Sequence, residues 1–503
     1  MSFKNLISCR DVLWWMVFSG IAVNFMLRVN LNLVIVAIVP PPENSPIISQ
    51  CNQIDNTKIN NVTLLDNRTL STFGNYQLNS SRMVNDQLFR WNEYEQGLAT
   101  GAYYWIHWLS EIPGGILARK YGTKVVFGIG NLMAALLGFF LPLAMNHHLY
   151  SLIFIRVIQG LVAGVAYPAT HDMTAKWIPQ NERSKFVSAY MGGGVGIGLT
   201  YPLCGFIIEN VNWEIVFYCT SCFGIIWYIL WLFLVYDTPQ QHPRISEKEK
   251  NYILDNLGTS VDHEYQETSI PWRKILTSLP VWLTILSNWG AVWGYFTLMT
   301  QAPAYFKFIH GWSINKTGIL SGLPHFMTMV FSWIFAHLCD WLLRTERLSI
   351  TNVRKLATFI CAGMPSLTIL GLSFSGCYPA LAVFFILCGI AGAGASSSGP
   401  LANLVDLSPN YASVLLGICG LVVDIAGFLS PIVVGILTNE NQTIDQWRLI
   451  FIIATLNMGL SCIIYSIWGT AEQQTWNRYQ RVVVDVEDNN LTMELKKTEN
   501  NHS

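Results

Sequence analysis

The feature that most constrains this chain is a series of apolar segments, each long enough to cross a membrane. About 20 mostly apolar residues in a helix span the hydrocarbon core of a bilayer. Only 12% of the 503 residues are charged, against about 25% in an average soluble protein, so lipid must be the main solvent. The predicted spans are 12–39, 93–117, 123–145, 149–175, 185–208, 213–236, 278–303, 315–340, 352–375, 379–402, 411–436 and 446–470.

These spans fall into two sets of six, and the polar stretch 237–277 separates them. Many secondary transporters consist of two such repeated halves. The sequence therefore predicts an all-α protein with two six-helix bundles, 12–236 and 278–470, and with polar tails at 1–11 and 471–503. The first apolar run is too long for a signal peptide and has no small-residue cleavage site, so we expect it to remain as the first helix.

Lysine and arginine residues are concentrated in the loops on one side of the predicted bundle. They follow the second, fourth and eighth spans, whereas the loops near His147, Asn210 and Cys377 have none. Cytoplasmic loops carry this excess of positive charge. Both tails and the linker are thus predicted to be cytoplasmic, in a plasma membrane or in a lysosomal or vesicular membrane.

A long polar loop, 40–90, lies on the opposite side in this topology. It contains glycosylation sequons, which are used only when they face a lumen or the exterior. Cys51 is isolated within the loop and most other cysteines lie in apolar runs, so no disulfide is predicted. The predicted glycosylation sites are Asn61, Asn67 and Asn79.

Two arginines lie within predicted membrane helices, where an ionisable side chain usually has a function. Arg28 is in the middle of the first span, and Asn24 and Asn32 lie one turn to either side of it on the same face. We expect Arg28 and Asn32 to face a substrate cavity. Arg156 lies in the fourth span, on a stripe that also contains Tyr167 and His171. We assign this stripe to the substrate pathway too, with a buried structural tie as the alternative for Arg156.

Acidic groups within the spans are candidates for binding a coupling ion, either Na⁺ or a proton. Asp424 is the only acid deep in the C-terminal half, and it could exchange a proton or provide an oxygen ligand to Na⁺. Glu111 is near the cytoplasmic end of the second span. It is a second candidate, although a gating salt bridge with a loop arginine is its expected role. No cofactor or metal site and no catalytic grouping of side chains is predicted.

Several short motifs occur in the order found in one transporter branch. They resemble the anion:cation symporter branch of the major facilitator superfamily, which contains sialin, the vesicular glutamate transporters and the type I sodium/phosphate cotransporters. The motifs are RVNL at 28–31, IPGG at 112–115, YGTK at 121–124, RVIQGLV at 156–162, YPATH at 167–171, WIP at 177–179, ERS at 182–184, HPRIS at 242–246, NLVD at 403–406 and YAS at 411–413.

The resemblance implies alternating access, with organic or inorganic anions as substrates and protons or Na⁺ as the driving ion. It also places Arg28 and Arg156 at the two anion-handling arginine positions of the family. Departures are Ala163, where many members have a glutamate tied to proton handling, and Thr100 and Ala291, where the glutamate transporters have histidine and arginine. The pattern is therefore more similar to the inorganic phosphate cotransporters of invertebrates than to glutamate transporters.

We interpret the chain as a monomeric secondary transporter in the lipid bilayer, with a small anionic substrate. An uncoupled organic-anion or urate uniporter remains an alternative because Ala163 cannot bind a proton. A membrane receptor or sensor derived from a transporter is the alternative from another class. An enzyme is not expected, and the net charge of −1 offers no basic face to a nucleic acid.

Overall fold

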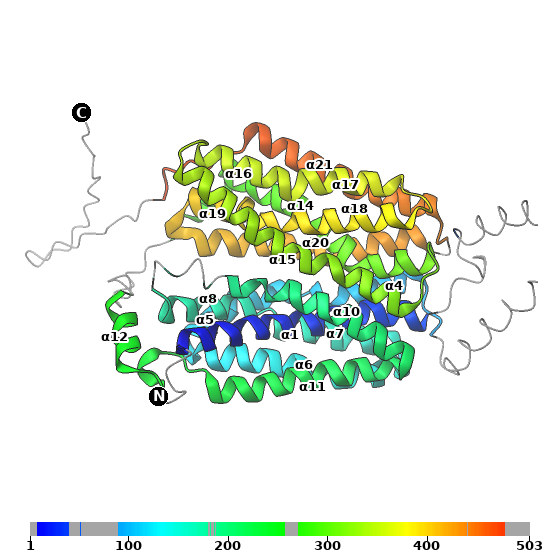
Figure 1. Cartoon of the computed structure of the whole chain (residues 1–503), viewed down its shortest axis with the longest axis horizontal. Coiled ribbons are helices and arrows are strands. Elements are labelled where there is room, and N and C mark those ends of the chain that lie inside the picture. The colour runs from blue at the N-terminus through cyan, green and yellow to red at the C-terminus, as the bar shows by residue number, and fades with distance from the viewer. Residues whose placement is uncertain are drawn as a thin grey trace, which may run out of the picture.

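The computed structural model describes residues 8–39, 51, 89–179, 182, 186, 188–256, 270–439 and 441–477. The predicted glycosylation sites Asn61, Asn67 and Asn79 lie outside these residues. The described chain is helical and forms two halves that lie side by side along the long axis of the molecule (Figure 1).

Six spans make up the N-terminal half. The second, fourth and fifth spans are interrupted, so each consists of more than one helical element. The spans are α1 (Cys9–Ile38); α4 (Glu93–Gly101), η2 (Ala102–Tyr104) and α5 (His107–Tyr121); α6 (Thr123–His147); α7 (Leu149–Ala163) and α8 (Ala166–Trp177); η4 (Ser188–Met191) and α10 (Gly192–Asn210); and α11 (Trp213–Leu234).

The C-terminal half repeats this layout after a linker with η5 (Pro239–Gln241), α12 (Glu247–Asn256) and α13 (Trp272–Leu276). Its third, fourth and fifth spans are the interrupted ones. The spans are α14 (Leu279–Phe308); α15 (Ile314–Arg344); α16 (Ile350–Thr358), η7 (Phe359–Gly363) and α17 (Met364–Ser373); α18 (Pro379–Gly392), η8 (Ala393–Ser397) and α19 (Pro400–Leu407); η9 (Pro409–Tyr411) and α20 (Ala412–Thr438); and α21 (Ile444–Trp468).

Side-chain caps fix several helix starts. Asn92 and Glu95 form a reciprocal capping box at the start of α4, which satisfies two backbone donors that the helix leaves open. Ser8, Ser313 and Ser349 each accept a hydrogen bond from a backbone N–H in the first turn of α1, α15 and α16. Replacing such a cap with alanine typically costs about 1 kcal/mol.

Ten helical segments of the described chain are long and apolar enough to cross a membrane. The two further predicted spans fall below that criterion because both carry polar side chains. Glu93, Glu95 and Glu111 lie in the helices of the second span, and Asn288 and Gln301 lie among the 30 residues of α14. Both spans lie at the contact between the halves, where polar side chains face protein or a cavity rather than lipid.

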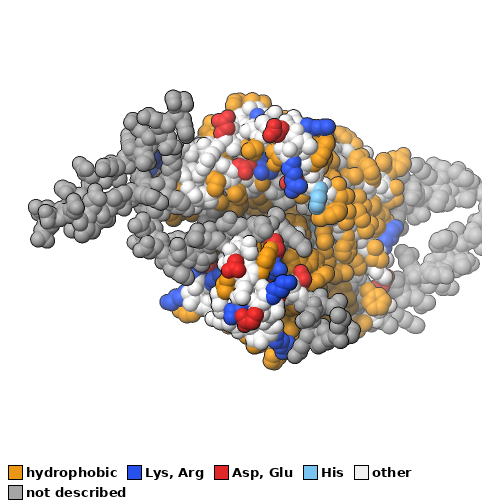
Figure 2. All heavy atoms as spheres, turned by 60° about the vertical axis from the view of Figure 1, so that its left-hand side comes forward, with side chains coloured by type: hydrophobic (Ala, Val, Ile, Leu, Met, Phe, Trp, Pro, Cys, Tyr) orange, Lys and Arg blue, Asp and Glu red, His pale blue; other side chains and the backbone are white. Residues whose placement is uncertain are grey.

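Charged and apolar surfaces are separated as a membrane requires. Figure 2 shows charged side chains gathered on the end of the molecule near α12 and hydrophobic side chains along the flank. Large apolar side chains such as Leu143, Phe154 and Phe233 are 65–68% exposed, as expected for a surface in contact with lipid. At the α12 end, Glu249 accepts hydrogen bonds from the backbone N–H of Cys9 and of Arg10, so the linker helix packs against the start of α1.

The two halves contact each other mainly through α4 with α20 and α10 with α15. Glycines permit close approach at the end away from α12. A Cβ on Gly435 would lie 3.0 Å from the Cα of Tyr94, and one on Gly205 would lie 3.0 Å from the Cα of Asn315. Small residues at helix crossings let backbones pack closely in membranes, and here they close that end of the molecule.

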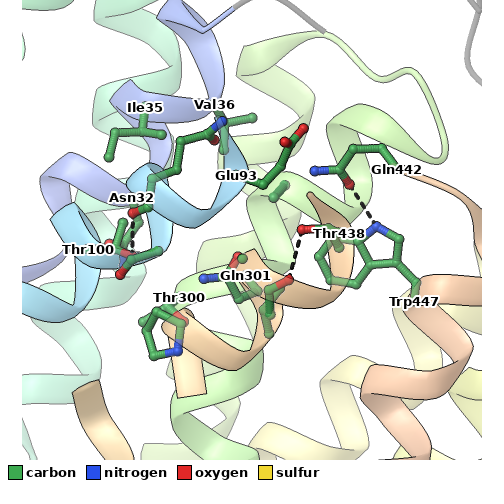
Figure 3. A pocket seen from close by; sticks show the side chains of 16 residues that line it. Asn32, Ile35, Val36, Glu93, Thr100, Thr300, Gln301, Thr438, Gln442 and Trp447 are labelled. Carbon is green, nitrogen blue, oxygen red and sulfur yellow. Dashed lines mark hydrogen bonds between the residues drawn. The ribbon is translucent and has the colours of Figure 1, made fainter. Parts of the chain in front are cut away.

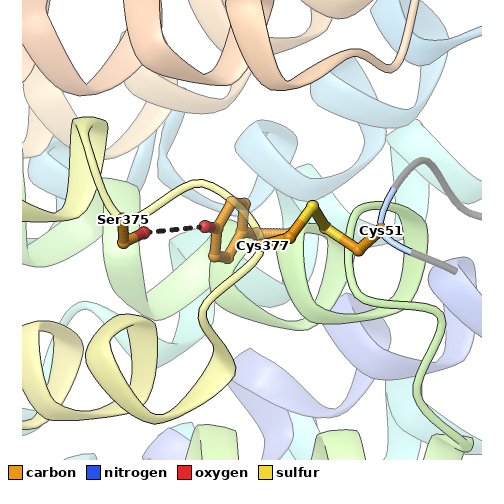
Figure 4. Close-up of a disulfide and its surroundings, with 4 residues drawn as sticks. Cys51, Ser375 and Cys377 are labelled. Carbon is orange, nitrogen blue, oxygen red and sulfur yellow. Dashed lines mark hydrogen bonds between the residues drawn. A yellow bond between two sulfur atoms is a disulfide. The ribbon is translucent and has the colours of Figure 1, made fainter. Parts of the chain in front are cut away.

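A disulfide also joins the halves at this end, which corrects the expectation from the sequence. Cys51, in the loop after α1, is bonded to Cys377 between α17 and α18 (Figure 4). Hydrophobicity alone gave no sign of this pair, because the two cysteines are 326 residues apart. Next to Cys377, Ser375 lies 3.5 Å from the hydroxyl of Tyr305, so this loop also contacts α14.

Candidate functional site

A pocket opens between the halves near the closed end of the molecule (Figure 3). It has about 400 Å³ of empty space, part of which is open to solvent. Residues of α1 and α4 line one side and residues of α14 and α20 line the other. Asn32, predicted to bind substrate, lines the pocket, and its amide donates to the hydroxyl of Tyr201 at 3.2 Å. Arg28 lies one helical turn further into the molecule on α1.

Arg28 is a buried cation at the contact between the halves. Its Nη2 lies 2.9 Å from Nε2 of His107, and the rings of Phe25, Tyr103 and Tyr104 have their centres 4.5–5.3 Å from its Cζ. The residue is 6% exposed, and its Nε has no hydrogen-bond partner among the described residues. A guanidinium has five N–H donors, so Arg28 retains donors for an anionic ligand.

His107 connects Arg28 to the opposite half. Its Nδ1 lies 2.8 Å from Oδ2 of Asp424 on α20, and both residues are buried. His107 is the first residue of α5, directly after the interruption at η2, and this break directs the side chain across the interface. Asp424 therefore faces the N-terminal half, and this ion-coupling candidate lies in the same cluster as the predicted substrate arginine.

Glu111 lies one turn after His107, with its Oε1 3.7 Å from Nδ1 of that residue. The structure thus places Glu111 beside the buried histidine, whereas the sequence predicted a pair with a loop arginine. Ligand atoms of His107, Glu111 and Asp424 lie within 4.8 Å of one another. We assign no metal ion to them, because the Arg28 guanidinium contacts the same imidazole and would repel a cation.

Arg156 has a different environment from Arg28. It is fully buried, and its Nη atoms donate to the backbone carbonyls of Leu27 and Arg28 at 3.0 and 2.6 Å and to Oε1 of Gln159 at 2.9 Å. In this conformation both Nη atoms of the Arg156 guanidinium are already bonded, to carbonyls of α1 and to Gln159 on α7. This favours the alternative considered from the sequence, a structural tie, and the tie fixes the backbone from which Arg28 projects.

The other predicted substrate residues lie around this centre at different depths. The ring centre of Tyr167 on α8 lies 6.0 Å from that of Tyr190. His171 is on the exposed side of α8, where its Nδ1 lies 3.3 Å from the Tyr190 hydroxyl. The structure therefore brings Arg28, Glu111 and Asp424 together and leaves His171 outside the cluster.

Sequence reasoning overlooked His107. A signal was present, because His107 lies four residues before Glu111 in a membrane span, and residues with this spacing share a helix face. The contact with Asp424 is 317 residues distant in sequence, so it emerges only from the tertiary structure.

The fold and this buried cluster define a membrane transporter with two halves around a central charged site. The family model of the Major Facilitator Superfamily matches residues 17–431. The chain therefore belongs to the Major Facilitator Superfamily, a family of membrane transporters and not of enzymes.

Curated relatives narrow this assignment. The chain is 35% identical over 402 residues to vesicular glutamate transporter 3 of Danio rerio, a match that covers 79% of this chain and 68% of the relative. It is 34% identical over 418 residues to vesicular glutamate transporter 1 of Bos taurus, covering 82% and 73%. The resemblance inferred from the sequence motifs is thereby confirmed.

Solved structures share the fold. A bacterial homologue of the human lysosomal transporter Spinster, in an inward-facing and unoccupied conformation, aligns with a TM-score of 0.62 at 13% identity and covers 91% of this chain and 96% of its own. A D-xylose–proton symporter aligns with a TM-score of 0.55 at 12% identity, covering 88% and 97%. The major facilitator fold predicted from the sequence is confirmed.

Proposed function

We propose that this protein transports an organic or inorganic anion across a membrane by alternating access and that a proton or Na⁺ gradient drives the transport. The observation that carries the proposal is Arg28, a buried and permanently charged side chain with free donors between the two halves. A guanidinium pairs bidentately with carboxylate or phosphate. Similarity to vesicular glutamate transporters supports an anionic substrate.

The arrangement suggests how the anion reaches Arg28. The pocket that Asn32 lines lies one turn of α1 away from Arg28, toward the end of the molecule away from α12. If the halves rock about the Arg28 cluster, a bound anion becomes accessible from one side and then from the other. Arg156 supports this movement by holding the carbonyls of Leu27 and Arg28, so that α1 and α7 move together.

The remaining features of the proposal come from the sequence. The excess of lysine and arginine in the loops on one side supports cytoplasmic tails. The proposal includes a plasma membrane or a lysosomal or vesicular membrane as the location, and a monomer as the working unit. An uncoupled uniporter is the alternative that one observation favours. The backbone carbonyl of Ala163 accepts a hydrogen bond from Asn24, but its methyl side chain cannot bind a coupling ion.

Uptake by the reconstituted full-length protein tests the proposal. Inorganic phosphate, urate, sialate and glutamate are offered in turn, under separate proton and Na⁺ gradients. We expect uptake of at least one anion, and near-complete loss of it in both Arg28→Ala and Arg28→Lys, because lysine lacks the planar fork. Arg448→Lys, at a partly exposed arginine on α21, is the matched control.

Two outcomes would contradict this function. One is the absence of uptake of all four anions by correctly folded protein. The other is normal uptake by Arg28→Lys at normal expression, which would exclude bidentate binding. An uptake rate that neither the proton gradient nor the Na⁺ gradient changes would favour the uniporter.

A further inference from the structure

The hydrogen bonds of His107 determine which of its ring nitrogens carries the proton. Arginine has N–H donors and no acceptor, so Nε2 of His107, 2.9 Å from Nη2 of Arg28, must accept and cannot carry a hydrogen. Its Nδ1 lies 2.8 Å from the Asp424 carboxylate, where a donor is required. In this conformation His107 is therefore the neutral Nδ1–H tautomer, bonded to both halves of the protein.

We propose that His107 is the proton-binding site of this transporter, and that a proton on its Nε2 and an anion on Arg28 bind together. The inference rests on the proposed anion transport and identifies the proton as the coupling ion. A proton from the aqueous phase forms an N–H bond with the lone pair of Nε2. The hydrogen bond from Nη2 of Arg28 then breaks, because two N–H donors face each other, and Arg28 turns its fork to the anion.

The surroundings of His107 favour binding of the proton and the anion together. The titratable and charged groups that face it are Arg28 from α1, Asp424 from α20, Glu111 on α5 itself, and Tyr103 and Tyr104 from η2. A proton adds one positive charge to this buried cluster and a monovalent anion adds one negative charge. Binding of both leaves the net charge unchanged, whereas binding of either alone leaves an uncompensated charge away from water, which is costly. Each ligand therefore raises the affinity for the other.

The contact between His107 and Asp424 links this loading to the movement of the halves. It joins titratable side chains of opposite halves directly, from α5 to α20. A doubly protonated imidazole keeps its Nδ1–H bond to Asp424 and gains charge attraction to it. Protonation of His107 thus strengthens its hydrogen bond to Asp424 across the interface in the same step that frees Arg28 to bind the anion.

Substitution of His107 separates this role from a structural one. His107→Gln retains an acceptor for Arg28 but cannot take up a proton. His325→Gln is the matched control, because His325 on α15 is also fully buried but its Nδ1 faces the hydroxyl of Tyr295 rather than a carboxylate. Uptake of phosphate, urate, sialate and glutamate is measured with the membrane potential clamped at zero and a gradient of one pH unit.

For one proton per anion, that gradient can raise steady-state accumulation by up to about tenfold in the wild type and in His325→Gln. His107→Gln should show no stimulation by the gradient while still exchanging anion across the membrane. Asp424→Asn removes the charge that faces the imidazolium, and it should lose the stimulation as well. Stimulation of His107→Gln equal to that of the wild type would overturn the proposal while leaving anion transport intact.

A spectroscopic measurement decides the tautomer without any substrate. In ¹⁵N-histidine-labelled, reconstituted protein, the signal that disappears in His107→Gln should report a protonated Nδ1 and a bare Nε2. Addition of the transported anion should convert it to a doubly protonated ring. A protonated Nε2 with a bare Nδ1 in the unliganded protein would overturn the proposal even if none of the four anions were taken up.

Discussion

Gly160 on α7 packs directly against the backbone of the second span, so the effect of adding a methyl group there can be calculated from the structure. A Cβ at this position would lie 2.8 Å from the carbonyl carbon of Tyr103 and 3.3 Å from its Cα, with the carbonyl oxygen closer still. Carbon atoms prefer separations of about 3.5–4.0 Å. Gly160→Ala therefore requires the two spans to separate by roughly 1 Å, and backbone atoms have no rotamer that relieves the contact.

The expected cost follows from a comparison with a second glycine. Overpacking of this kind typically costs about 1–3 kcal/mol, while replacing glycine with alanine in a helix gains up to about 1 kcal/mol. Gly417 on α20 offers the same gain without the clash, because no described atom outside its own helix backbone lies within 4 Å of the place that a methyl group would take. Gly160→Ala should thus be about 1–3 kcal/mol less stable than Gly417→Ala.

Thermal unfolding of the two variants in the same detergent measures this difference. Uptake should fall in Gly160→Ala as well, because the Tyr103 ring lies 5.0 Å from the Cζ atoms of both Arg28 and Arg156. Equal melting temperatures for the two variants would refute the reasoning, since the clash is the contribution that distinguishes them.

Three further predictions concern the disulfide, the buried His310 and the sequons of the loop 40–90. Cys51→Ser and Cys377→Ser should each lower stability, by about 2–4 kcal/mol, and the double variant should be no worse than either single one in thermal unfolding; additive losses would show that the bond does not form. Burial and the nearby charge of Lys316 lower the pKa of His310, between α14 and α15, to about 4, so only the unfolded chain takes up this proton between about pH 6.5 and 4. Stability should therefore fall as pH drops through that range, and a melting curve of His310→Gln that kept the full wild-type pH dependence would contradict the assignment. Changing Asn61, Asn67 and Asn79 together to Gln should abolish the glycan mobility shift on gels with little loss of uptake, whereas an unchanged shift would place the glycans elsewhere.

The pattern of hydrophobic residues was sufficient to predict the fold, because a membrane helix is recognised by the length of its own apolar run. It also singled out Arg28 and Asp424, whose charge in an apolar segment is itself unusual, and the structure connects the two through His107. Hydrophobicity could not predict that the Arg156 guanidinium would donate hydrogen bonds to the carbonyls of Leu27 and Arg28. Contacts such as His107 with Asp424, or Cys51 with Cys377, depend on how the two halves dock, and no periodicity within one helix encodes that.

The bond between Cys51 and Cys377 has a consequence for the synthesis of the protein. Cys51 follows the first span, whereas Cys377 follows the ninth, 326 residues later. A disulfide requires an oxidising compartment, so the thiol of Cys51 must persist there while eight more spans are inserted. Only a chain whose C-terminal half has joined its N-terminal half can then oxidise correctly. The bond would mark completed assembly, and a chain truncated within the linker would display an unpaired thiol to the quality-control oxidoreductases of that compartment.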